Sequence, residues 1–136
     1  MMEIHFQVDG EPQGKARPRF TRYGKPYTPK KTTDYENSIR TEYIEAGGEC
    51  TGFPVKVKIS AAYKIPKATS KAIRAKMIAG DLRPVKKPDL DNIAKAVCDA
   101  LNGIAYKDDA QIVCLEVCKY YSEYPHITVT VKEVLP

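Results

Sequence analysis

The chain has 136 residues, 43% of them apolar, which suits one compact domain with its own core and excludes an array of domains. Its 22 lysines and arginines outnumber 17 acids and give a net charge of +5. No apolar run approaches the roughly 20 residues of a membrane-spanning helix, and no secretory leader is evident, so we expect a single domain over residues 1–136, cytoplasmic and without a membrane partner.

The first third of the chain is predicted to form a strand, a loop and a helix, in that order. Apolar and polar residues alternate over residues 3–8, which predicts a half-buried strand. Prolines and glycines recur through residues 10–31, GEPQGKARPRFTRYGKPYTPKK, which predicts an extended loop. Thr33 and Glu36 have the spacing of a capping box, and the apolar residues that follow predict a helix as far as Gly47.

The remainder alternates strands and helices. Residues 55–63 predict a strand with one basic, wetted face, and a short helix capped by Thr69 or Ser70 should run to Gly80. The next helix lies within KPDLDNIAKAVCDALNG, residues 87–103. Residues 111–121 and 127–134, joined by SEYP, predict an antiparallel hairpin. The order β-α-β-α-α-β-β indicates an α+β domain with a small mixed sheet flanked by helices.

Positive charge is concentrated in two blocks. Residues 12–33 contain seven lysines and arginines and no acid, and residues 56–87 contain ten with a single acid, Asp81. Such segregation favours a polyanionic partner, because neutralised phosphates release their condensed counterions. A lysine-rich surface that is merely solvated remains the alternative.

The helix at residues 87–103 has two distinct faces. Its apolar face is complete without any charged residue and comprises Ile93, Ala96, Val97, Ala100, Leu101 and Ile104. The opposite face carries Asn92, Lys95, Asp99 and Asn102. Asp89 and Asp91 stand at the helix start, where an aspartate can simply cap backbone amides, and Asp108 and Asp109 follow after a short connection.

One cap does not explain five acids within 21 residues. Two carboxylates about 5 Å apart repel by roughly 3 kcal/mol at an effective dielectric of about 20, so a converged cluster needs a cation. Lys95 offsets part of the repulsion, and carboxylate oxygen suits Mg²⁺. His5 and His126 lie far apart in sequence, which gives a zinc site little support.

The four cysteines, Cys50, Cys98, Cys114 and Cys118, lie in otherwise apolar segments. This pattern favours buried thiols in a reducing compartment over a disulfide framework. Cys114 and Cys118 share a strand face, and we interpret that pair as core packing.

Carboxylates that hold Mg²⁺ beside a lysine, within a basic surround, are suited to phosphodiester hydrolysis. The sequence therefore predicts a nuclease. A non-catalytic DNA-binding protein and a small phosphatase or nucleotide hydrolase remain as alternatives.

KPDLDNIAKAVCDALNG followed by KDDAQI closely resembles the core motif of the RusA family of Holliday junction resolvases, and the segment GEPQGKARPRFTRYGKPYTPKKTTDYE is similar to the opening of phage-type members. The resemblance implies a homodimeric, Mg²⁺-dependent, structure-selective endonuclease that cuts four-way DNA junctions in recombination and repair, with Mn²⁺ as a substitute ion. Its catalytic residues carry over to Asp89, Asp91, Lys95 and Asp109, with Asp108 as a further metal ligand.

The basic residues around these motifs are the expected phosphate contacts. They are Lys15, Arg17, Arg19, Arg22, Lys30, Lys31, Lys86 and Lys87. Phe20, Tyr23 and Tyr27 lie among them and either stack on bases or pin the loop to the domain.

Overall fold

A computed structural model describes all residues, 1–136. The main elements are β1 (Glu3–Asp9), α1 (Lys30–Glu45), β4 (Val55–Lys64), α2 (Lys71–Ala79), α3 (Leu90–Leu101), β5 (Ile112–Ser122) and β6 (His126–Glu133). Two short strands, β2 (Arg19–Phe20) and β3 (Pro26–Tyr27), lie between β1 and α1, and a 3-10 turn, η1 (Asp109–Gln111), precedes β5. The predicted α+β class and the order of the main elements are confirmed.

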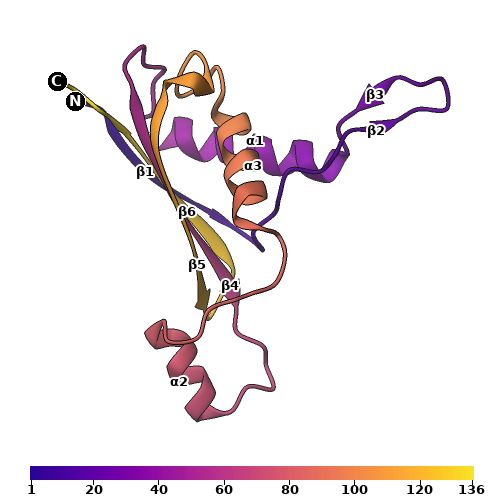
Figure 1. The fold of residues 1–136 in the computed structure, drawn as a ribbon, viewed down its shortest axis with the longest axis vertical. Helices are drawn as coiled ribbons and strands as arrows, with labels where there is room; N and C mark the ends of the chain where they lie inside the picture. The colour runs from indigo at the N-terminus through magenta and orange to yellow at the C-terminus, as the bar shows by residue number, and fades with distance from the viewer.

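The sheet has the strand order β1-β6-β4-β5 (Figure 1). β4 is central and pairs parallel with β5 and antiparallel with β6. The predicted β5–β6 hairpin is therefore wrong, because β4 lies between the two strands. The connection of residues 123–125 is long enough to cross the end of β4, since strands lie about 4.8 Å apart. Apolar alternation marks both strands, but it does not say which strand is the neighbour.

Helices α1 and α3 cover one face of the sheet, and Figure 1 shows both on the same side. The core between them is one cluster of 21 buried residues, in which Val57 and Ile59 of β4 meet Ile39 of α1 and Val97 of α3. The predicted apolar face of α3 is confirmed, except that Ile104 is only half-buried. The opposite face of the sheet carries polar and charged side chains, such as the Lys58–Glu116 ion pair.

Helix α1 begins three residues before the predicted cap. Pro29 is its N-cap, and no side chain caps the helix, so the predicted Thr33–Glu36 capping box is wrong. Pro29 already has the extended conformation that precedes a helix, and it lacks the amide hydrogen that would need a partner. The Glu36 carboxylate is instead bound by Lys15 and Arg40.

Two further predictions need correction. The loop of residues 10–31 contains the β2–β3 hairpin, whose turn is closed when Thr21 N donates to the Lys25 carbonyl and Gly24 adopts φ +80°. Of the four cysteines only Cys98 is buried; Cys50 and Cys114 are exposed and Cys118 is intermediate. Cys114 is exposed because β5 is the edge strand of the sheet. None of the helices is both long and apolar enough to cross a membrane.

Candidate active site

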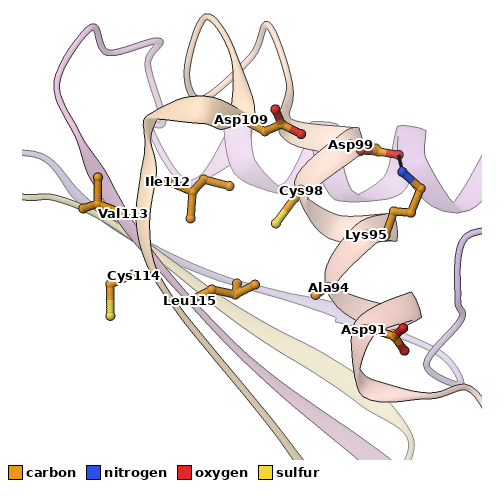
Figure 2. Close-up of a pocket in the computed structure, with 10 residues that line it drawn as sticks. All are labelled: Asp91, Ala94, Lys95, Cys98, Asp99, Asp109, Ile112, Val113, Cys114 and Leu115. Carbon is orange, nitrogen blue, oxygen red and sulfur yellow. Dashed lines mark ion pairs between the residues drawn. The ribbon is translucent and has the colours of Figure 1, made fainter.

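An open cavity of about 540 Å³ lies between α3 and the start of β5 (Figure 2). Its polar side carries Asp91, Lys95 and Asp99 from α3 and Asp109 from η1. Ile112 and Leu115 of β5 point across toward the helix, as Figure 2 shows. The cavity therefore combines an acidic rim with an apolar floor.

Asp109 reaches this rim because the connection after α3 is held at several points. Gly103 turns the chain at φ +80°, and the buried Tyr106 hydroxyl donates to the Cys98 carbonyl at 2.7 Å. The side-chain amide of Gln111 donates to the backbone carbonyls of Thr51 and Phe53 at 2.9 and 3.0 Å. These contacts fold the connection back toward the end of α3, so that Asp109 lines the same cavity as Asp91.

Lys95 belongs to a chain of ion pairs. Its ammonium lies 3.5 Å from the Asp99 carboxylate one turn further along α3, and the same carboxylate oxygen is 3.7 Å from the Lys15 ammonium. Lys15 also binds Glu36, which is almost fully buried. Asp99 thus orients Lys95 and links it to α1. Sequence reasoning placed Asp99 on the polar face of α3 and counted it among the clustered acids, but it could not give Asp99 a specific role because its Lys15 partner lies 84 positions away.

The other two predicted acids occupy different surroundings. Asp89 is the N-cap residue of α3 but makes no side-chain cap hydrogen bond. It lines a neighbouring cavity of about 440 Å³ that also contains Lys31 and Lys87. Asp108 caps η1, where its carboxylate accepts from Ala110 N at 3.2 Å. Asp89 is therefore free of the capping role, whereas Asp108 has one.

The structure groups no three acidic, histidine or cysteine side chains closely enough to hold a metal ion by themselves. The four predicted ligands are thus not brought together; Asp91 and Asp109 share a cavity, Asp89 lies beside it and Asp108 is engaged elsewhere. Two carboxylates nevertheless fit Mg²⁺, which commonly takes one or two from the protein and the rest of its oxygens from water and substrate phosphate.

The eight predicted phosphate contacts lie in different surroundings. Lys86 is exposed, and its ammonium lies 5.6 Å from the Tyr63 ring centroid. Arg17, Arg19 and Arg22 are exposed, form no ion pair and belong to the β2–β3 hairpin or the irregular segment that leads into it. Lys31 and Lys87 lie beside Asp89, whereas Lys30 lines a separate cavity on α1. Lys15 is engaged by two carboxylates, which leaves its charge largely neutralised.

Sequence reasoning did not single out two cations, Arg83 and Lys119, that lie next to the segment carrying Lys86 and Lys87. The Arg83 guanidinium lies 4.2 Å from the Tyr120 ring centroid, and the Lys119 ammonium donates to the Lys86 carbonyl at 2.6 Å. The lysine within the largely apolar β5 strand was the available signal.

Cys98 lines the cavity as a neutral thiol, because burial raises its pKa to about 11. Its thiolate fraction at pH 8 is low, so it should react with a disulfide reagent at least about tenfold more slowly than the exposed Cys50. The rate at Cys98 should keep rising with pH up to about 11. Mass spectrometry of peptides labelled over a pH series measures both rates, and equal rates at pH 8 would contradict the assignment.

Comparison with known proteins identifies a family. The family model described as Endodeoxyribonuclease RusA matches residues 9–132. The uncharacterized protein YqaN of Bacillus subtilis (strain 168) is 39% identical over an alignment of 143 positions, which covers 96% of each chain. The family match spans both the basic hairpin and the acidic cavity. The chain therefore belongs to the RusA family of endodeoxyribonucleases.

Proposed function

We propose that this endonuclease resolves four-way (Holliday) DNA junctions by paired nicks, with Mg²⁺ as its cofactor, in recombination and repair. The observation that supports this proposal is the cavity that Asp91, Lys95 and Asp109 line together. Exposed Lys31 and Lys87 line the neighbouring cavity beside Asp89, and further exposed cations lie on the β2–β3 hairpin. An acidic centre within a positive surround attracts the DNA backbone and retains a divalent cation at the same place.

In the proposed mechanism each side chain has a separate task. Asp91 and Asp109 would hold the ion, and Asp89 would support them from the adjoining cavity. A divalent ion at this position supplies Lewis-acid polarisation of the phosphate and lowers the pKa of water. Lys95 places a positive charge near the negative charge that grows on the phosphate oxygens. Asp99 keeps the Lys95 ammonium on the cavity side of α3.

A homodimer fits this reaction, because a four-way junction is nearly two-fold symmetric and its resolution needs two opposed nicks. The edge of β5 supports such an assembly. Val113 and Leu115, which also line the cavity, are 60% and 47% exposed on this strand, whose outer edge has no partner strand. An exposed apolar edge strand readily pairs with another strand, and a second copy of the chain supplies one of identical sequence.

Charging this edge should therefore separate the subunits. We expect Val113→Lys combined with Leu115→Lys to raise the dimer dissociation constant at least tenfold and to uncouple the two nicks, since each lysine must be desolvated in the interface. Sedimentation velocity and a cruciform plasmid that distinguishes one nick from two measure these effects. Ile78→Lys on α2, a residue 58% exposed, is the matched control. A dimer that survives both lysines would place the interface elsewhere.

The function itself is tested with a synthetic four-way junction and a linear duplex of the same sequence. We expect symmetric nicks in the junction with Mg²⁺ or Mn²⁺, none with EDTA and none in the duplex. A non-catalytic structure-specific DNA-binding protein, the alternative, would retard the junction on a gel without nicking it. Binding should weaken steeply with salt, whereas a nucleotide phosphatase would show no such dependence.

A further inference from the structure

The β2–β3 hairpin forms an arm outside the body of the protein, defined here as residues 17–28. Figure 1 shows it projecting from the start of α1, away from the sheet. Every one of its residues is exposed. Its hydrogen bonds are internal, such as those that the Thr21 hydroxyl accepts from the amides of Tyr23 and Lys25 at 3.3 and 3.1 Å. The arm is therefore not needed to complete the core.

Three aromatic side chains on the arm are exposed and lie outside the hydrophobic core. Phe20 is 68% exposed, Tyr23 is 81% exposed and Tyr27 is 46% exposed. These exposures rule out the alternative that the rings pin the loop to the domain. Rings left in water on a projecting arm are available to stack on planar groups of a ligand, and every nucleic acid base offers such a face.

The charge on the arm indicates the kind of ligand. Arg17, Arg19, Arg22 and Lys25 give it four positive charges and no negative one, and none of the four is in an ion pair. The Arg22 guanidinium lies 5.3 Å from the Tyr23 ring centroid, so a cation and a ring are presented together. A second copy of this basic chain is a poor electrostatic match, whereas DNA supplies both phosphates and bases.

The root of the arm is fixed beside the proposed catalytic cavity. Lys15 N donates to the Asn92 carbonyl in the first turn of α3 at 3.2 Å, and the Lys15 side chain binds Glu36. Gly14 packs so closely that a Cβ there would lie 3.0 Å from Asn92 Cβ and 3.1 Å from Pro88 Cβ. The aromatic tip and the acidic rim are consequently held on one rigid base, through the start of α3.

We propose that the arm recognises unstacked bases at the branch point of the junction, with Phe20 and Tyr23 stacking on them while its arginines hold the adjacent phosphates. This inference rests on the proposed function for the nature of the DNA. Linear duplex offers no unstacked base, so the rings contribute to branched DNA alone. The arm thereby aligns the branch point with the cavity that cuts near it.

The test measures DNA binding without metal, in EDTA, so that it is independent of cleavage. Phe20→Ala combined with Tyr23→Ala should weaken junction binding by about 30-fold or more, because each stacked base contributes appreciably to affinity, and should change duplex binding less than twofold. Phe20→Tyr combined with Tyr23→Phe should bind the junction like the wild type. Tyr124→Ala, which removes a ring 58% exposed elsewhere, is the matched control.

A second readout follows the bases directly. The fluorescence of 2-aminopurine placed at the branch point should change when wild-type protein binds, and this change should be lost with the double alanine variant. Wild-type junction affinity in that variant, or equal losses for junction and duplex, would overturn the proposal. A change from dimer to monomer would reassign the arm to the subunit interface. If wild-type protein binds the junction with the expected fluorescence change but never nicks it, the arm stands and the proposed nuclease mechanism fails.

Discussion

Asp91→Asn is expected to reduce junction cleavage by at least about 100-fold while junction binding persists and the metal-free protein keeps or raises its melting temperature. The carboxylate is exposed, and its side-chain hydrogen bond is a local one from Asn92 N at 3.0 Å, which an amide oxygen can also accept. Substitution removes a favourable interaction with the helix dipole worth about 0.5 kcal/mol, but it also lowers the negative charge next to Asp89, two positions earlier in the chain. Stability should therefore change little.

Matched measurements separate the catalytic role of Asp91 from a structural one. Asp81→Asn makes the same change of charge in the exposed turn after α2 and should leave cleavage within about twofold. Nicking assays in Mg²⁺, gel retardation in EDTA and thermal melts of both variants complete the comparison. If Asp91→Asn instead costs more than about 2 kcal/mol of folding free energy, the carboxylate is a structural cap and the catalytic assignment is wrong.

Patterns contained within one element predicted this fold well. The two-faced pattern of α3 assigned Ile93 and Val97 to the core, and both are fully buried. Ser70 caps α2 by accepting from Ile73 N, and Gly80 ends it at φ +85°. In each case the residues that decide the structure lie within a few positions of each other, so their spacing carries the information.

Contacts between distant residues could not be predicted in the same way. Strand alternation gave β5 and β6 but not the insertion of β4 between them. Asp109 was placed at the cavity by a motif, whereas its position depends on Gln111 reaching Thr51 and Phe53 across 60 and 58 residues. The role of Asp99 could not be assigned from the sequence, because its contact with Lys15 forms only when the chain is folded. The site was thus predictable in its composition and only partly in its geometry.

Glu36 shares the Lys15 ammonium with Asp99, and Glu36→Ala is expected to lower the free energy of unfolding by about 2–3 kcal/mol. The carboxylate is nearly buried and binds the Lys15 ammonium and the Arg40 guanidinium, the latter at 3.2 Å. Its loss leaves two partly buried cations facing each other. Urea denaturation at pH 7 measures the effect, and Glu45→Ala at the exposed end of α1 should stay within about 0.5 kcal/mol of the wild type.

The Lys15–Glu36 contact can be isolated by a double-mutant cycle. If Lys15 is destabilising once Glu36 is gone, then Lys15→Ala combined with Glu36→Ala should recover at least about 1 kcal/mol relative to the sum of the single changes. Additive losses would show that Glu36 contributes through packing and Arg40 alone.

Because Lys15 also forms the root of the arm, the same variants should lose discrimination between junction and duplex as the arm loosens, even where cleavage chemistry at Asp91 is intact.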